Sequence, residues 1–380
     1  MPFEGITVVS LEQAVAAPFA TRQLADLGAR IIKIERPLTG DFARGYDRTV
    51  NGMSSHFVWL NRSKESLALD LKEEESKKIL EELLSKADVF IQNLAPGAVD
   101  RLGFSPQILK KKYPQLIVCS ISGYGSYGPY RDKKAYDLLV QCEGGVLSIT
   151  GTEEHPCKVG ISIVDIAAGM YAYTGVLTAL LARYKTGKGT VIEVSMLEAL
   201  GEWMGYPVHY STSGTEPKRT GANHATIFPY GPFKSGDHKS VFLGIQNERE
   251  WERFCGMVLN LPELASDPQF NSNSNRVKNK EVLKAKIISV FQKLTANEII
   301  DRLEEAQIAN ASLNTIQEFV NHPQLQVRNR WREVNSPVGP IKMLIPPVTF
   351  DDIDFVMNPI PEVGEHNELI LRELGWEIKS

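Results

Sequence analysis

The stretch ITVVSLEQAVAAPFATRQLADLGARIIKIE, residues 6–35, decides the fold class. Its two ends, 6–11 and 29–35, are apolar runs that predict β-strands, and residues 21–27 between them predict a helix. The same alternation continues with a helix over 73–85 and strands over 88–92 and 116–122. Apolar strands that are separated by helices and do not strictly alternate with polar residues are typical of a parallel sheet covered on both faces. The sequence therefore predicts a doubly wound α/β domain.

Length and composition narrow the class of protein. The chain has 380 residues, more than the roughly 100–200 of an ordinary domain, which favours two domains or one large domain with an insertion. Hydrophobic residues make up 43% of the chain, enough for a large core. The formal net charge of -4 argues against a nucleic-acid partner, which needs a basic surface. The four cysteines lie far apart and form no C-x-x-C pair, so a disulfide framework and a zinc site are not expected.

Neither a signal peptide nor a membrane span is expected. The opening MPFEGITVVSLEQ lacks a basic stretch before an apolar run. The longest uncharged stretch, 166–182, is broken by glycines and is shorter than the about 20 apolar residues of a membrane span, so it predicts a buried helix. We therefore expect a cytoplasmic protein without a membrane partner, an organelle lumen being the alternative.

A change of composition near residue 201 divides the chain. The predicted parts are, in chain order, a large α/β domain over 1–200, a linker over 201–225, a small inserted α+β domain over 226–322, a second linker over 323–350, and a C-terminal return to the large domain over 351–380. Within the small domain, Thr295 and Glu298 predict a capping box at a helix start. Gly375 predicts a left-handed C-cap for a short helix over 365–374.

The segment GYGSYG, residues 123–128, matches a dinucleotide-binding pattern but is not expected to bind a nucleotide. That pattern works when a helix follows, because the first amides of the helix hold a pyrophosphate. Here PYRD follows at 129–132, and the first strand–helix turn, at 12–18, contains no glycine. The seven histidines are scattered without metal-ligand spacing. We expect a tight loop, no metal and no tightly bound cofactor.

Basic residues recur at the ends of the predicted strands and helices. They are Arg36, Arg62, Lys64, Lys72, Arg101 and the run from Arg131 to Lys134. Ligands bind at the carboxyl ends of parallel strands, so cations kept there by an acidic protein suggest a polyanionic cofactor. The competing interpretation is that they only solvate the surface.

Asp165 is a carboxylate among apolar and small residues, in VGISIVDIAAG (159–169). It either caps the long helix that follows or serves as a nucleophile beside small residues that admit a substrate. The two roles are compatible. Asp137, in AYDLLVQ, has the same ambiguity.

Seven stretches in a fixed order carry a resemblance to a known family. They are 16–44, 61–72, 91–104, 122–137, 159–169, 186–199 and 364–375. The ordered set spans nearly the whole chain and resembles the class III CoA-transferases, a family that includes α-methylacyl-CoA racemases and carnitine and formyl-CoA transferases. The resemblance implies a Rossmann-like large domain, a smaller domain, coenzyme A as co-substrate, and a homodimer whose two chains interlock.

The same resemblance implies the site residues. The nucleophilic aspartate of the family corresponds to Asp165, and the acid that assists beside it corresponds to Asp137. The coenzyme A contacts correspond to Val15, Ala16, Arg36, Leu69, Lys72, Asn93, Leu94, Ala95, Arg101 and Lys134. An ordinary aspartate, with a pKa of about 3.9, is ionised at neutral pH and needs no general base. We therefore expect Asp165 to attack an acyl-CoA directly.

Two departures from the family bear on the substrate. Racemases carry a histidine before the second aspartate, where this chain has Tyr136, so a proton-shuttling racemase would lack one base. Formyl-CoA transferases carry a run of glycines, and residues 201–260 contain no such run.

Residues 40–72 resemble those of family members that move CoA from succinyl-CoA to C4–C5 dicarboxylates, which is the activity we expect. Arg44, Arg48 or Arg219 would then hold the distal carboxylate. The alternative is a racemase-type isomerase, followed by a formyl-CoA/oxalate transferase. A dehydrogenase and a non-catalytic binder of CoA esters are the competing classes.

Overall fold

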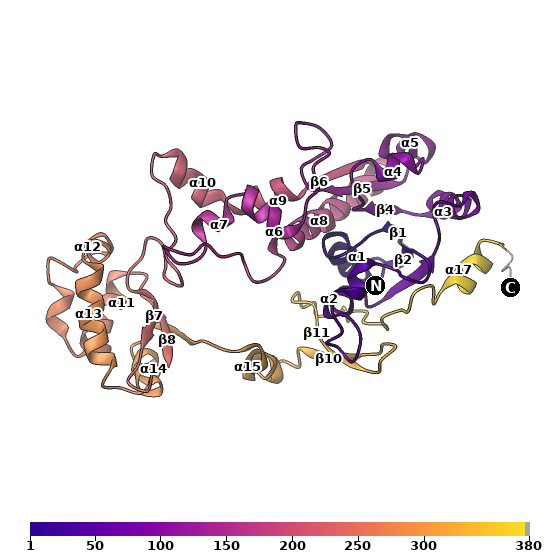
Figure 1. The fold of residues 1–380 in the computed structure, drawn as a ribbon. Helices are drawn as coiled ribbons and strands as arrows, with labels where there is room; N and C mark the ends of the chain where they lie inside the picture. Colours follow the sequence, from indigo (N-terminus) through magenta and orange to yellow (C-terminus); the bar gives the residue numbers. More distant parts are fainter. Residues whose placement is uncertain (377–380) are drawn as a thin grey trace. The chain divides into compact units, whose positions relative to one another are not determined.

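The computed structural model describes residues 1–376, which divide into two compact units (Figure 1). Unit 1 comprises residues 1–146, 159–206 and those from 325 onward. Unit 2 comprises residues 147–158 and 207–324. The chain therefore passes from unit 1 into unit 2 twice, briefly at 147–158 and then for the longer stretch 207–324.

Unit 1 is built on a six-stranded sheet in which every neighbouring pair of strands is parallel. Its strands are β1 (Thr7–Leu11), β2 (Arg30–Glu35), β3 (Lys64–Ala68), β4 (Val89–Gln92), β5 (Ile117–Ser122) and β6 (Val191–Ser195), in the order β3-β2-β1-β4-β5-β6. The order reverses between β1 and β4, and ligands of open parallel sheets bind outside the carboxyl ends of the strands at such a point. The loops after Leu11 and Gln92 are therefore where a ligand site is expected.

Helices cover both faces of this sheet (Figure 1). On one face, Val9, Ile32 and Phe90 share an apolar core with helices α3 (Glu74–Lys86), α4 (Ala98–Arg101), α5 (Pro106–Lys112) and α17 (Asn367–Glu373). Alternate strand residues point to the opposite face. There α1 (Ala16–Asp26) and α8 (Ile163–Thr186) pack against each other and against the sheet. Unit 1 also contains η1 (Phe42–Gly45), α2 (Ser55–Leu60), α6 (Asp137–Glu143), α9 (Met196–Trp203) and the hairpin of β10 (Trp331–Val334) and β11 (Ile341–Leu344).

The predicted elements of this domain are confirmed. The strands expected at 6–11, 29–35, 88–92 and 116–122 are β1, β2, β4 and β5, and the helices expected at 21–27 and 73–85 overlap α1 and α3. Gly375 has a φ of 79°, as the predicted left-handed C-cap requires.

Helix α8 corrects one expectation. A helix was predicted to be buried over 166–182, and the helix is present, but only 39% of its most apolar window is buried. Its outward side chains include Leu181, 62% exposed, and Tyr184, 91% exposed. By length and composition alone it is apolar enough to cross a membrane, a test that core helices of soluble proteins also pass.

Unit 2 packs helices against a small antiparallel sheet of order β7-β8-β9. Its core includes the fully buried side chains of Trp251, Phe254 and Phe291. The capping box of Thr295 and Glu298 is confirmed at the start of α14. The elements are β7 (Tyr230–Lys234), β8 (Ser240–Gly244), α11 (Glu248–Arg253), η2 (Phe254–Leu259), η3 (Pro262–Ala265), α12 (Asn273–Lys278), α13 (Lys280–Phe291), α14 (Ala296–Glu305), β9 (Ala309–Ser312) and α15 (Ile316–Val320).

Short helices stand where the chain passes from one unit to the other. They are α7 (Val146–Ile149), α10 (Gly205–Thr212) and α16 (Pro323–Val327). Helix α10 lies within residues 201–225, the segment predicted to be a linker.

Candidate active site

Asp165 lies in the first turn of α8 but does not cap it. The N-cap position belongs to Ser162, and Asp165 is the third residue of the helix. The interpretation of Asp165 as the cap is therefore wrong. Among residues 1–376, no group donates a hydrogen bond to its carboxylate, and the residue is only partly accessible. A carboxylate that is half-buried and free of internal donors is available to a substrate.

Asp137 supplies the cap that Asp165 does not. One oxygen of Asp137, Oδ1, accepts from the Val164 amide at 2.8 Å and the Asp165 amide at 3.4 Å. The other, Oδ2, accepts from Gln141 Nε2 at 2.7 Å. Asp137 itself begins α6, so it ties the starts of two helices together. The predicted pair of aspartates is thus brought together, with both oxygens of Asp137 engaged.

The environment of Asp165 changes its acidity. Burial, followed by the negative charge of Asp137, raises the pKa of Asp165 from 3.8 to about 7. We expected an ordinary, fully ionised carboxylate at neutral pH, and this expectation is wrong because an unpaired charge near a second carboxylate is poorly solvated. Near pH 7, Asp165 is present in both its protonated and its ionised form.

Tyr46 is a neighbour of this pair that the sequence did not single out. Burial, with the charges of Asp41 and Asp165, raises the pKa of the Tyr46 phenol to about 12. The ring also packs edge-on against His56, at 5.4 Å between centroids. Asp47 orders the intervening loop by accepting from the backbone and side chains of Thr49 and Ser55. No sequence signal linked this loop to Asp165, because 119 positions separate Tyr46 from it.

Gly169, one helical turn after Asp165, lets the start of α1 approach α8. A Cβ at this position would lie 2.6 Å from the carbonyl oxygen of Ala16 and 3.1 Å from Cβ of Phe19. Only glycine permits that approach without displacing backbone. The predicted CoA contact Ala16 therefore lies against α8, one helical turn from the predicted nucleophile.

The loop after β4 meets the loop after β1, as the strand order requires. The Asn93 side chain accepts from the Gln13 amide and donates to the Gln13 carbonyl, each at 2.8 Å. Leu94 and Ala95 follow on the same loop. At the neighbouring strand ends, the Leu69 amide donates to the Glu35 carbonyl at 2.9 Å, which places Leu69 beside the strand end that precedes Arg36. The predicted contacts thus gather at the carboxyl edge of the sheet.

The four predicted phosphate-binding cations are Arg36, Lys72, Arg101 and Lys134. All four are exposed, and none of them pairs with a carboxylate in the described part of the chain. The adjacent Lys133 differs, because it pairs with Glu143 and lies over the ring of Tyr130 at 4.3 Å. The four cations are therefore free to meet an anion.

Several other basic residues that the sequence singled out are already engaged. Arg44 binds Glu35 at 2.6 Å, Arg62 binds Asp26 at 2.7 Å, and Lys64 binds Glu12 at 2.7 Å. Arg219 donates to the carbonyl oxygens of Thr152, Ser148 and Glu153. Arg44 and Arg219 are therefore poor candidates for the distal carboxylate. Arg48 is exposed and, in the part of the chain that the structure describes, has no such partner.

The segment 123–128 is a loop, as predicted. Gly125 and Gly128 have φ values of 90° and 91°. Glu193 of β6 accepts from the backbone amide and the hydroxyl of Ser126, which fixes the loop against the sheet. The next helix starts only at Asp137. Within residues 1–376, no group of three or more His, Cys, Asp or Glu side chains is arranged to hold a metal.

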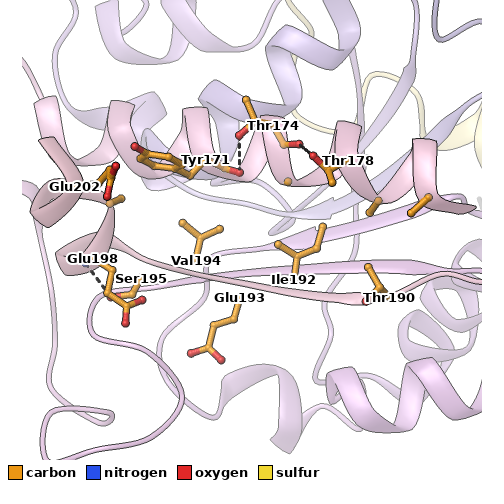
Figure 2. A pocket seen from close by; sticks show the side chains of 14 residues that line it. Tyr171, Thr174, Thr178, Thr190, Ile192, Glu193, Val194, Ser195, Glu198 and Glu202 are labelled. Atoms are coloured by element: carbon orange, nitrogen blue, oxygen red, sulfur yellow. Dashed lines mark hydrogen bonds between the residues drawn. The ribbon is translucent and has the colours of Figure 1, made fainter.

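An open groove of about 670 Å³ lies between α8, β6 and α9 (Figure 2). Its lining is largely small or apolar, and its charged groups are the carboxylates of Glu193, Glu198 and Glu202. None of the predicted site residues lines it. Three carboxylates would repel the phosphates of CoA, so this groove is a poor candidate for the CoA site.

Comparison with known proteins identifies the family. The model of CoA-transferase family III matches residues 3–367. The chain is 34% identical to the succinyl-CoA:glutarate CoA-transferase of Mus musculus, over 98% of this chain and 86% of that protein. It is 37% identical to the acetyl-CoA:oxalate CoA-transferase of Acetobacter aceti, over 90% of this chain and 89% of that protein. The chain belongs to CoA-transferase family III, and it is a CoA-transferase.

The fold agrees with this assignment. The crystal structure of a CAIB/BAIF family protein from Brucella suis superposes with a TM-score of 0.87 at 31% identity. The superposition covers 98% of this chain and 99% of that chain. The resemblance stated from the sequence is therefore confirmed.

Proposed function

We propose that this enzyme moves CoA from succinyl-CoA to a C4–C5 dicarboxylic acid such as glutarate. The name of the mouse relative, which specifies succinyl-CoA and glutarate, supports this choice. The observation that carries the proposal is Asp165, a half-buried carboxylate to which no group in residues 1–376 donates a hydrogen bond, one helical turn from the contact of Gly169 with Ala16.

In the proposed reaction, the Asp165 carboxylate attacks the thioester carbonyl of succinyl-CoA. The C–S bond breaks, CoA leaves as a thiolate, and a mixed anhydride joins the succinyl group to Asp165. The thiolate then attacks the Asp165 carbonyl, which releases succinate and leaves an aspartyl-CoA thioester. Each step exchanges one activated acyl group for another, so the free energy of the thioester is retained.

The second half of the reaction repeats these steps in reverse. The acceptor carboxylate attacks the aspartyl-CoA carbonyl, which gives a second anhydride and CoA thiolate. The thiolate attacks the acceptor's carbonyl, forms the new CoA thioester and releases the Asp165 carboxylate. We propose that Asp137 assists by holding the start of α8 and by raising the basicity of Asp165. Arg48 would hold the distal carboxylate.

A matrix of acyl-CoA donors and carboxylate acceptors, read by mass spectrometry, tests the substrate. Succinyl-CoA with glutarate is expected to give glutaryl-CoA and succinate. An oxalate acceptor is the alternative suggested by the Acetobacter aceti relative. Exchange of the α-proton in deuterated water without CoA transfer would instead indicate a racemase, although Tyr136 occupies the position of the racemase histidine.

We also propose that CoA is held by Val15 and Ala16, the strand-end residues Leu69 and Asn93–Ala95, and the four unpaired cations. Charge-assisted contacts to phosphate contribute about 1.5–3 kcal/mol each. Single alanine variants of Arg36, Lys72, Arg101 or Lys134 are therefore expected to weaken CoA binding about tenfold or more in calorimetry.

Lys133→Ala is the matched control for Lys134→Ala. It removes the same charge from the adjacent position, but from a side chain already paired with Glu143. The control is expected to bind CoA nearly as tightly as the wild type. Wild-type affinity in all four site variants would remove the assignment.

We further propose the interlocked homodimer that the family resemblance implies. On unit 1, α8 exposes apolar side chains such as Leu181 and Tyr184, and the adjoining groove is lined largely by small or apolar residues (Figure 2). Surfaces of that kind usually mark an interaction site. A second copy of the chain would cover it.

Subunit exchange tests this assembly. Interlocked chains cannot separate without unfolding. When two homodimers that carry different tags are mixed, native mass spectrometry is therefore expected to detect no hybrid dimer over hours. Denaturing and refolding the mixture should produce the hybrid, which controls for detection. A folded, active monomer in light scattering at nanomolar concentration would contradict the proposal.

A further inference from the structure

A layer of fully buried charges lies beneath the first loop of unit 1. Glu12, Lys33, Asp41 and Lys64 are each at most 3% exposed. Lys33 Nζ lies 2.8 Å from Asp41 Oδ2 and 3.3 Å from Glu12 Oε1. Lys64 Nζ lies 2.7 Å from Glu12 Oε1. Lys33 lies in β2 and Lys64 begins β3, whereas Glu12 follows β1 and Asp41 lies in the loop after β2. The layer therefore joins segments far apart in the sequence.

Asp41 connects this layer to the backbone of the first loop. Its Oδ1 accepts from the Ala14 amide at 3.1 Å and from the Ala43 amide at 2.9 Å, while Oδ2 accepts from Lys33. Ala14 has a φ of 61°, a left-handed conformation that residues other than glycine rarely adopt. Such a conformation persists only where the surroundings impose it. Asp41 is one of the groups that impose it.

The Asn93 side chain also holds this loop, because its oxygen accepts from the Gln13 amide and its NH2 group donates to the Gln13 carbonyl. The turn at Ala14 then directs Val15 and Ala16 toward Gly169, whose missing side chain leaves room for the Ala16 carbonyl. Asp165 is one helical turn away along α8. The left-handed turn is therefore what places the Val15–Ala16 segment beside Asp165.

Stability alone does not explain this layer. Removing charges from water is costly, and buried ion pairs are often no more stabilising than apolar residues of similar size. In this layer, the Asp41 carboxylate accepts a hydrogen bond from the backbone amide of Ala14, a residue in an unfavourable backbone conformation. We propose that Asp41, oriented by Lys33, is a positioning residue that sets the Val15–Ala16 segment for CoA-ester binding and transfer. The expected effect on CoA transfer rests on the proposed function, whereas the expected effect on the conformation of the first loop does not.

Two matched variants test the proposal. Asp41→Ala removes the acceptor of the Ala14 amide. Asp26→Ala removes an aspartate that is equally buried, at 1% exposure, and that also pairs with cations, Arg22 at 2.9 Å and Arg62 at 2.7 Å. Asp26 is the last residue of α1, and its side-chain hydrogen-bond partners within residues 1–376 are Arg22 and Arg62, outside the first loop. Both variants are expected to melt at lower temperature than the wild type.

Hydrogen–deuterium exchange and kinetics should separate the two variants. In Asp41→Ala, a peptide covering residues 12–19 should exchange faster than in the wild type, and kcat/KM should fall about 100-fold, since small misplacements of a binding segment cost that much. In Asp26→Ala, both quantities should stay near the wild-type values. An unchanged loop in Asp41→Ala, or an equal loss of kcat/KM in both variants, would overturn the proposal.

Two further points keep the test decisive. If Asp41→Ala fails to fold, the double variant Lys33→Met/Asp41→Ala replaces it, because it removes the acceptor of the Ala14 amide without leaving a buried ammonium unpaired. Faster exchange of residues 12–19 in this double variant than in the wild type supports the proposal, and exchange as slow as in the wild type refutes it. The exchange readout needs no turnover, so failure of CoA transfer with every donor would refute the proposed function without deciding the role of Asp41.

Discussion

Replacement of Asp165 by alanine is expected to lower turnover by about four orders of magnitude or more, because loss of a nucleophile removes the covalent route altogether. CoA binding should change little, since the predicted phosphate contacts lie on other elements. The variant should also fold, because the Asp165 side chain accepts no hydrogen bond within residues 1–376 and the cap of α8 is supplied by Asp137.

Covalent capture makes this prediction specific to one residue. Wild-type enzyme incubated with the donor thioester and then hydroxylamine should carry the modification on the peptide that contains Asp165, as read by mass spectrometry. Asp132→Ala, which removes an exposed aspartate from the same unit, is the control and should be labelled like the wild type. Near-normal transfer by Asp165→Ala, or labelling of another residue, would show that the covalent mechanism is wrong.

The sequence predicted the sheet well because parallel strands leave a strong local pattern. β1, β4 and β5 are short, mostly apolar runs buried on both faces. β3 and β6 were not predicted, and the sequence of β3, KESLA, begins with two charged residues. Lys64 is nevertheless buried, since the carboxylate of Glu12, 52 positions away, pairs with it. Sequence analysis could not supply that long-range partner.

Long-range partners that the sequence does not show also explain the wrong predictions about the site. Alternation in β2 places Ile32 and Ile34 in the apolar core, and Lys33 on the opposite face, where it is fully buried. In the sequence, a lysine inside an apolar run gives no sign of a buried ion pair. The raised pKa of Asp165 likewise depends on burial and on Asp137, which is near in space because its oxygen caps α8. Residue type identified the nucleophile, but only the fold showed its protonation.

The rate of Asp165 acylation is expected to rise with pH and level off above about pH 8. The ionised carboxylate is the nucleophile, and its pKa is raised to about 7 by burial and then by Asp137. Below that value the rate should fall about tenfold per pH unit, because the ionised fraction does. Of the other groups that face Asp165, the Tyr46 phenol has its pKa raised to about 12 and stays neutral across this range. Rapid-quench measurements of the rate of acyl-enzyme formation between pH 5.5 and 9 provide the profile.

The free energy of unfolding should fall as the pH rises, whereas the acylation rate increases. The pKa of Asp165 is higher in the folded protein than the ordinary 3.8, so between about pH 4 and 7 the unfolded chain gives up this proton first. Rising pH therefore destabilises the fold through this group, at about 1.4 kcal/mol per unit of pKa difference. Asp165→Asn, which cannot ionise, should match the wild type near pH 4 and be more stable than it by a few kcal/mol at pH 8 in urea unfolding.

Asp137→Asn tests the cause of both effects. The amide oxygen can still accept from Val164 and keep the cap of α8, but the negative charge next to Asp165 is gone. The midpoint of the acylation profile should then move to lower pH, and only partly, because burial is the larger cause of the raised pKa. An acylation rate that stays constant down to pH 5 in the wild type would mean that Asp165 is ionised as an ordinary carboxylate when the substrate is bound. A midpoint unmoved in Asp137→Asn would assign the shift to burial alone.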